Sequence, residues 1–201
     1  MNFEYKVLDN FIPETYQNIL TEIYDTSIAQ WAYLPSLSDL SKDEIDINDS
    51  NIVPSFAFTQ KVYRADKNYT NHNWNFTAPM LWFLEHRTGV KIKSIERVHS
   101  NLMVPTGANA NTYNEPHIDH PSSDCLTMIY YVNDADGDTR LFNKTVDEGF
   151  KNLKLIHSQP PSKGTAMIFP SNRFHSSSCP INATSRVILN FVMHIENAFE
   201  V

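Results

Sequence analysis

The most regular strand pattern in this chain is found at Arg186–Ile195, which reads RVILNFVMHI. Side chains in a strand point alternately to its two faces, so every second residue shares a face. One face of this strand is wholly apolar and consists of Val187, Leu189, Phe191, Met193 and Ile195. The other face consists of Arg186, Ile188, Asn190, Val192 and His194. We therefore expect packed helices against the apolar face and the interior of a barrel against the other.

Arg186 points into that interior, where a guanidinium is strongly disfavoured unless it meets an anion. No acidic residue shares its face of the strand. The planar guanidinium binds a carboxylate through two parallel hydrogen bonds, so a carboxylate of a bound cofactor would fit this position. A structural ion pair with one of the aspartates of the chain is the alternative interpretation.

Short runs rich in β-branched or aromatic residues precede this strand, at 92–104, 126–133, 138–143, 151–158 and 164–169. Earlier, 8–13 reads as a strand leading into an amphipathic helix over 16–28, 53–64 as another strand, and 79–87 as a second helix that ends near Gly89. The polar segment 68–75 reads as a loop. Helices followed by many short strands predict an antiparallel sandwich or small barrel with helices on one outer face.

The length of 201 residues predicts a single domain over 1–201, in which 1–90 supply supporting helices and 91–201 form the barrel. The net charge of -7 does not favour a nucleic-acid partner. No stretch approaches the roughly 18 apolar residues of a membrane span, and no leader pattern opens the chain, so we expect a cytoplasmic protein with no membrane partner. Cys125 and Cys179 lack metal-site spacing and are expected to be free thiols. No feature of the sequence indicates an oligomeric state.

The segment Pro116-His117-Ile118-Asp119-His120 contains a candidate metal site. In an extended segment His117 and Asp119 project from the same side, while His120 points the opposite way and is expected at the surface or behind the ligands. His175, which follows Asp119 by 56 positions (175 − 119), offers a third ligand. Two imidazoles and one carboxylate on one face of an ion leave the opposite positions open, which suits Fe(II) and oxygen chemistry.

Alternation in the neighbouring strands adds further candidates. Tyr131 shares a face with Thr127, and either hydroxyl could join Arg186 on the same anion. Asn101 shares a polar face with Arg97, and it could reach a cofactor or substrate or could bond a neighbouring loop. The acidic segment 37–51 is expected to be a solvated loop or a lid over a pocket.

These residues, in this order, resemble the Fe(II)- and 2-oxoglutarate-dependent oxygenases, most closely their prolyl 4-hydroxylase-like branch. The resemblance covers 100–195. His117-Ile118-Asp119 stands where that family has His-x-Asp, and Arg186 follows His175 by 11 positions (186 − 175) in the place of the 2-oxoglutarate anchor. The segments 124–133, 136–142 and 164–170 are similar to the family's Tyr-Leu-Asn strand, its Gly-Gly-x-Thr-x-Phe turn and its Gly-x-x-x-x-Phe-Pro strand.

The resemblance implies a fold and a set of roles. The fold would be mainly β with flanking α-helices, a double-stranded β-helix (jelly-roll, cupin-like) with N-terminal helices packed on the outer sheet. His117, Asp119 and His175 would hold Fe(II), and Arg186 with Tyr131 would hold the far carboxylate of 2-oxoglutarate. The family's Tyr-x-x-Gly is replaced at 104–107, so Asn101 or Tyr113 would substitute for its tyrosine. The remaining substrate-side candidates are Arg97 and Asn190.

The activity implied by the resemblance is hydroxylation of an unactivated C–H bond by O2, with decarboxylation of 2-oxoglutarate to succinate. The substrate would be a small molecule or a peptide: a prolyl residue, a free amino acid or another small metabolite. The alternative is a cupin-like protein that binds a metal or another ligand through the same residues without catalysis. Arg186 distinguishes the two, because a purely structural metal needs no buried anchor for a carboxylate.

Overall fold

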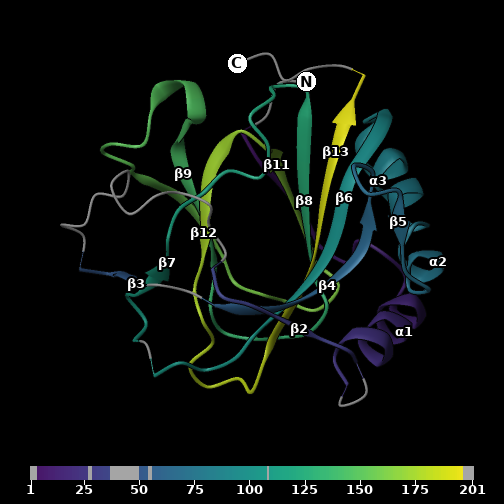
Figure 1. Ribbon diagram of the computed structural model, residues 1–201, viewed down its shortest axis with the longest axis horizontal. Coiled ribbons are helices and arrows are strands. Elements are labelled where there is room, and N and C mark those ends of the chain that lie inside the picture. The colour runs from purple at the N-terminus through teal and green to yellow at the C-terminus, as the bar shows by residue number, and fades with distance from the viewer. Residues whose placement is uncertain (1–3, 27–28, 37–49, 54–55, 108, 197–201) are drawn as a thin grey trace.

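The computed structural model describes residues 4–26, 29–36, 50–53, 56–107 and 109–196. Two antiparallel sheets face each other and enclose the interior (Figure 1). Nearly all of the acidic segment 37–51, which was expected to be a loop or lid, lies outside the described residues.

The larger sheet has eight strands in the order β1-β11-β8-β13-β6-β4-β2, with β5 paired to β4. In chain order these are β1 (Lys6–Leu8), β2 (Ala32–Leu34), β4 (Ala57–Arg64), β5 (Tyr69–Thr70), β6 (Ile92–Met103), β8 (Cys125–Tyr131), β11 (Ala166–Pro170) and β13 (Arg186–Ile195). β13 lies between β6 and β8 and is antiparallel to both. The strand with the clearest sequence pattern is therefore at the middle of the large sheet.

The smaller sheet has three strands in the order β10-β9-β12. They are β9 (Thr139–Thr145), β10 (Leu155–Gln159) and β12 (Arg173–Ser177), with a short 3-10 helix, η1 (Val146–Glu148), after β9. Two short strands, β3 (Ile52–Val53) and β7 (Tyr113–Asn114), pair in parallel beside this sheet. β12 carries His175, so the smaller sheet contributes to the candidate metal site.

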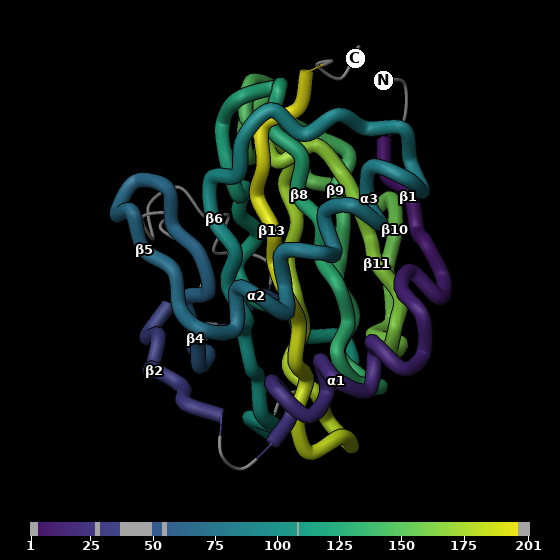
Figure 2. The backbone as a smooth tube through the Cα atoms, turned by 90° about the vertical axis from the view of Figure 1, so that its right-hand side faces the viewer, coloured from purple at the N-terminus to yellow at the C-terminus, as the bar shows by residue number. Residues whose placement is uncertain are grey.

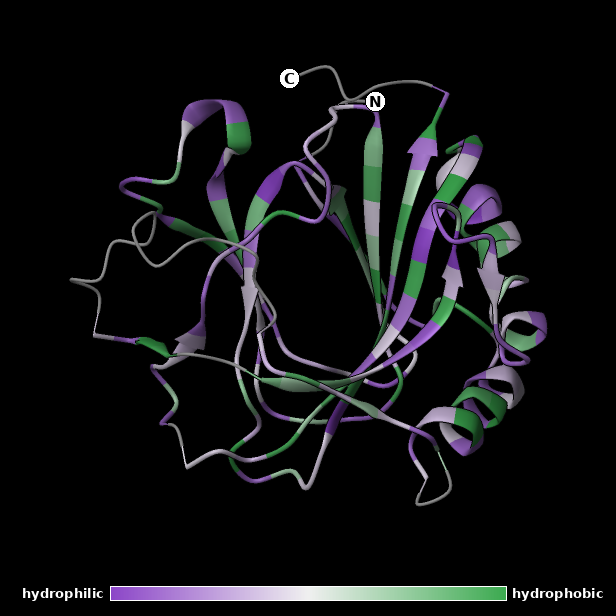
Figure 3. Cartoon of the chain, viewed as in Figure 1, coloured by the Kyte–Doolittle hydropathy of each residue, from purple (hydrophilic) through white to green (hydrophobic). Residues whose placement is uncertain are grey.

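Three helices cover the outer face of the large sheet: α1 (Glu14–Tyr24), α2 (Trp74–Thr77) and α3 (Met80–Thr88) (Figures 1 and 2). The apolar face of β13 lies in the core between the sheet and these helices, and every residue of it is at most 2% exposed. α1 contributes Leu20 and Tyr24 to that core, and α3 contributes Met80 and Leu84. In Figure 3 the middle strands β8 and β13 are largely green or pale, in keeping with their apolar outer faces. The face assignment made from alternation is thus confirmed.

Most predicted elements are present, with several differences. The first strand is Lys6–Leu8 and not 8–13, the strand predicted at 151–158 begins at Leu155, and the short strands β2, β3 and β7 were not predicted. β12 was not predicted, because its polar sequence RFHSS has no apolar alternation and its strand geometry comes from pairing with β9. The segment 68–75, expected to be a loop, contains β5 and the start of α2. The first helix is shorter than its apolar pattern suggested and ends at Tyr24. Both cysteines are free and buried, as expected. Within the described residues, no helix has the length and apolar character needed to cross a membrane.

Gly164 joins the N-terminal segment to the large sheet. Its substitution tests how α1 packs against that sheet. Its φ is 81°, its carbonyl accepts the N–H of Phe11 (2.7 Å), and an added Cβ would overlap the side-chain amide of Gln17. That amide donates to the carbonyl of Ile12 (2.9 Å), so a displaced Gln17 would loosen α1.

We predict that Gly164→Ala lowers the free energy of unfolding by more than Gly107→Ala does. Both sites have positive φ, 81° and 77°, and each substitution should lose about 1–2 kcal/mol for that reason. Only Gly164→Ala meets a buried neighbour, which should add about 1–3 kcal/mol. Urea unfolding of the two variants measures the difference, and equal losses would contradict this account of how α1 is docked.

Candidate metal centre and its cavity

His117 and His175 are brought together by backbone pairing between the segment that follows β7 and the strand β12. The N–H of each residue donates to the carbonyl of the other, both at 2.9 Å, in an isolated antiparallel bridge. Their ring centroids are 4.4 Å apart, and Nε2 of His175 lies 3.5 Å from Oδ2 of Asp119. One ligand atom from each of the three residues lies within 4.8 Å of the others. The His-x-Asp pair and the distant histidine therefore form one cluster.

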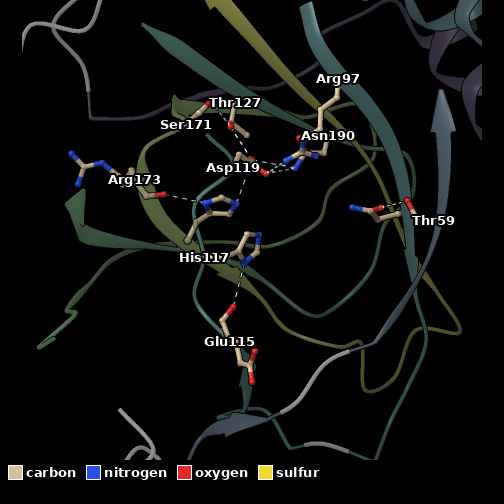
Figure 4. A network of polar contacts seen from close by, with 11 residues as sticks. Thr59, Arg97, Glu115, His117, Asp119, Thr127, Ser171, Arg173 and Asn190 are labelled. Carbon is tan, nitrogen blue, oxygen red and sulfur yellow. Dashed lines mark hydrogen bonds and ion pairs between the residues drawn. The ribbon is translucent and has the colours of Figure 1, made fainter. Parts of the chain in front are cut away.

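Both imidazoles are oriented by backbone carbonyls. Nδ1 of His117 lies 3.3 Å from the carbonyl oxygen of Glu115, and Nδ1 of His175 lies 3.1 Å from that of Arg173 (Figure 4). A proton on each Nδ1 would complete these hydrogen bonds and leave each Nε2 with a free lone pair for a cation. Burial, reinforced by the neighbouring His175, lowers the pKa of His117 to about 4. This ring is therefore neutral at pH 7, as a metal ligand must be.

The carboxylate of Asp119 is 3% exposed and receives hydrogen bonds from three side chains (Figure 4). Arg97 donates from Nη2 to Oδ1 (2.5 Å), and Thr127 donates from Oγ1 to Oδ2 (2.8 Å). The amide of Asn190 lies 3.3 Å from Oδ1 and 3.2 Å from Oδ2. Burial would raise the pKa of this carboxyl, but Arg97, the two imidazoles and Thr127 outweigh it and hold the pKa below its ordinary value. Asp119 is thus an anion with a fixed orientation.

Three residues predicted from the sequence as cofactor or substrate contacts donate hydrogen bonds to Asp119. Thr127 was expected beside Arg186, but it pairs with Val192 of β13, towards the opposite end of that strand from Arg186. Its hydroxyl also contacts Oγ of Ser171 at 2.8 Å. Arg97 and Asn190 were predicted as substrate-side residues; both donate to the carboxylate of Asp119, and Asn190 also lines the cavity described below. A buried anion such as Asp119 is stabilised by the donors that face it. Which donors face it depends on how the strands are assembled, so the sequence alone did not show it.

Arg186 is 1% exposed, and its hydrogen-bond partners among the described residues are neutral. Nε donates to the carbonyl of Gly137 (2.7 Å), Nη2 to Oγ1 of Thr139 (2.8 Å), and Nη1 lies 3.7 Å from Sδ of Met103. Within the described residues, no carboxylate lies within 4.0 Å of this guanidinium, so the structural ion pair considered above is not formed there. Burial lowers the pKa of Arg186. A bound anion would offset this unfavourable burial.

Tyr131 and Thr139 complete the surroundings of Arg186. The hydroxyl of Tyr131 donates to Oγ1 of Thr139 (2.8 Å), and the guanidinium lies 5.9 Å from the centroid of the tyrosine ring. Thr139 was not predicted as a site residue, although it stands at the threonine of the segment compared with Gly-Gly-x-Thr-x-Phe. Position 137 in the same turn requires glycine, because a Cβ added there would lie 2.6 Å from the carbonyl oxygen of Ser178.

One cavity is lined both by the two candidate histidine ligands and by Arg186. It is lined by His117 and His175 at the metal centre and by Thr139 and Arg186 at the anion end, together with Asn101, Met103, Ile129, Ser176, Ser177, Ile188 and Asn190. Including the part open to solvent, it contains about 400 Å³ of free space. Asn101 faces this cavity and accepts a hydrogen bond from Thr59 (2.8 Å). Tyr113 packs against Phe142, with the guanidinium of Arg140 over its ring.

By sequence, the chain matches no protein-family model and no curated protein. By structure it is similar to an oxidoreductase of the 2OG-Fe(II) oxygenase family from Burkholderia pseudomallei (TM-score 0.62, 12% identity, 98% of this chain and 87% of that chain). It is also similar to a Trichoplax adhaerens prolyl hydroxylase in complex with a hypoxia inducible factor peptide (0.58, 13%, 96% and 84%). A third similar structure is the epimerase SnoN in complex with Fe³⁺, alpha ketoglutarate and nogalamycin RO (0.60, 12%, 95% and 78%).

At these identities the likeness concerns the fold. The chain has the double-stranded β-helix fold of Fe(II)- and 2-oxoglutarate-dependent oxygenases. The predicted fold class, a mainly β jelly roll with N-terminal helices on its outer sheet, is confirmed.

We predict that Thr127→Val weakens Fe(II) binding about 10- to 100-fold, the effect typical of losing a residue that orients a metal ligand. Valine keeps the shape of threonine but removes the hydroxyl that holds Oδ2 of Asp119. Thr77→Val is the matched control, because Thr77 is equally buried and its hydroxyl bonds Asn73 and Tyr24 under the helices. Anaerobic titration with Fe(II) measures both affinities, and an unchanged affinity in Thr127→Val would contradict the assigned role.

Proposed function

We propose that this chain is an Fe(II)- and 2-oxoglutarate-dependent dioxygenase that hydroxylates an unactivated C–H bond. His117, Asp119 and His175 would hold Fe(II), since two imidazoles and a carboxylate on one face are the ligands that non-haem iron prefers. Arg186 would bind the far carboxylate of 2-oxoglutarate, with the hydroxyls of Thr139 and Tyr131 beside it. The cosubstrates are 2-oxoglutarate and O2.

The observation that carries the proposal is the buried guanidinium of Arg186. It shares a cavity with His117 and His175, and none of the described carboxylates pairs with it. A metal that served structure alone would not need this cation, whereas a dicarboxylate that chelates the metal and extends along the cavity does. The three metal-binding side chains thus fit Fe(II), and the unpaired guanidinium fits the far carboxylate of a 2-oxoglutarate bound to that metal.

The protein would contribute position, charge and exclusion of water. Arg97, Thr127 and Asn190 fix the carboxylate of Asp119, so the ligand does not have to reorganise when the metal binds. The carbonyls of Glu115 and Arg173 orient the two imidazoles. When bound, Fe(II) and 2-oxoglutarate would activate O2, so that a C–H bond of the substrate becomes C–OH while 2-oxoglutarate is converted to succinate and carbon dioxide.

The substrate would be a prolyl residue in a peptide, a free amino acid or another small metabolite. The Trichoplax enzyme is in complex with a peptide and SnoN with nogalamycin RO, so structures of this fold accommodate both kinds of ligand. Asn101 faces the cavity and would contact the substrate or the cosubstrate. The fold by itself is a weak guide to the substrate, so a panel of peptides and amino acids is the direct test.

We predict that His175→Ala abolishes 2-oxoglutarate turnover, because the metal loses one of three ligands. Arg186→Ala should chiefly raise the KM for 2-oxoglutarate, because it removes the partner of the far carboxylate while leaving the metal ligands intact. Succinate formation with Fe(II), O2 and panels of free amino acids and proline-containing peptides measures both variants. Turnover retained by His175→Ala would contradict the metal assignment.

A spectroscopic measurement separates this proposal from the cupin-like alternative, in which the same residues bind a metal without catalysis. Under anaerobic conditions, the protein with Fe(II) and 2-oxoglutarate should develop the weak visible charge-transfer band of the chelate. Arg186→Ala should require more 2-oxoglutarate to reach the same absorbance. Bound iron that shows no band at any 2-oxoglutarate concentration would favour the non-catalytic alternative.

A further inference from the structure

A second cluster of metal-ligating side chains lies at the opposite end of β13 from Arg186. His194 of β13 stands directly across from Cys125 of β8 in the antiparallel register, so both side chains share one face. The ring of His120 meets that of His194 with centroids 5.3 Å apart. One ligand atom from each of the three residues lies within 4.8 Å of the others. None of them belongs to the His117, Asp119 and His175 cluster.

His194 is already oriented as metal-binding histidines are. Both carboxylate oxygens of Asp124 lie 3.2 Å from its Nδ1, so a proton on Nδ1 faces the carboxylate and Nε2 keeps its lone pair. Sγ of Cys125 lies 3.6 Å from Nε2 and 3.4 Å from Nδ1. In a tetrahedral zinc site with Zn–N of about 2.0–2.1 Å and Zn–S of about 2.3 Å, the two donor atoms are about 3.5 Å apart. The thiol and the imidazole therefore have the spacing of zinc ligands.

We propose that His120, Cys125 and His194 form a second metal site that binds Zn²⁺, with water as the fourth ligand. Imidazole and thiolate are the ligands that zinc prefers, whereas the carboxylate-containing cluster suits Fe(II). Cys125 is buried, while the side chain of His194 is 25% exposed, so the ion would enter from the histidine side. On binding, the thiol loses its proton to solvent. The N–H of Ser122 donates to Nδ1 of His120 (3.1 Å), and coordination by this ring exchanges that hydrogen bond for the ion.

The ion would connect three parts of the chain. Cys125 begins β8, His194 lies near the end of β13, and His120 directly follows Asp119. The N–H groups of Asp119 and His120 both donate to the carbonyl of Ser171, at 3.0 and 3.2 Å, so these two residues are held as one segment. Zinc at the second site would therefore fix the segment from which Asp119 projects. This role is structural and does not depend on the proposed oxygenase activity.

Cobalt(II) gives a direct test, because cobalt bound to a thiolate has a near-ultraviolet charge-transfer band that a site without sulfur cannot produce. Metal-free protein would be titrated anaerobically with Co²⁺ while absorbance and bound equivalents are measured. We expect the band to appear in the native chain and in His175→Ala, and to be bleached when Zn²⁺ displaces Co²⁺. Cys125→Ser should lose the band and one equivalent of cobalt. Cys179→Ser is the matched control, since it alters the other buried cysteine, and should keep both.

Two results would overturn the proposal: no charge-transfer band in the native chain, or a band that persists in Cys125→Ser or disappears in Cys179→Ser. Far-ultraviolet circular dichroism checks that the variants are folded. His194→Gln provides an independent route if Cys125→Ser does not fold, because this residue is partly exposed. It should weaken cobalt binding at the thiolate site by about 10-fold or more. Unchanged affinity in His194→Gln would also refute the site.

Discussion

The antiparallel pairing of β13 with β6 and β8 is the constraint on which the rest of the structure depends. It fixes the register, and the register decides which face of each strand meets the helices and which meets the cavity. A shift by one residue would turn Phe191 into the interior and Arg186 into the helical core. The same pairing sets Ile188 against Tyr131 at one end and His194 against Cys125 at the other. β13 therefore contributes Arg186 to the candidate anion site, Asn190 to the hydrogen bonds on Asp119 and His194 to the second candidate metal site.

The charges inside the barrel are distributed unevenly. Asp119 is surrounded by donors, with Arg97, Thr127 and Asn190 all on its carboxylate. Arg186 has only neutral acceptors among the described residues. Because a buried charge is costly when unpaired, the first arrangement stabilises the carboxylate of Asp119 in place and the second favours the binding of an anion at Arg186. This asymmetry is what makes the cavity suited to a metal at one end and a carboxylate at the other.

Much of this site could be predicted from sequence because its residues lie on strands or carry recognisable spacing. Alternation alone placed Arg186 and Tyr131 in the interior, and the spacing of His117, Asp119 and His175 suggested a cluster that the structure assembles. Thr127 was predicted as a possible partner of the anion at Arg186, whereas its hydroxyl donates to Asp119, because alternation gives the face of a residue but not its partners. Thr139 was overlooked for a similar reason: its hydroxyl becomes significant only beside Arg186. His120 was set apart correctly from the first cluster, but its neighbour His194 could not be recognised.

The sequence by itself determined the class of fold and the faces of the strands, since both follow from local periodicity and from residues near one another in the chain. Only the tertiary structure decided which polar groups meet. The bridge that joins His117 to His175, the bond from Asn190 to Asp119 and the pairing of Cys125 with His194 all link residues far apart in sequence. Such contacts depend on sheet register and on the way the two sheets face each other. Those are properties of the assembled chain, because backbone hydrogen bonds between distant strands carry no signature in either strand alone.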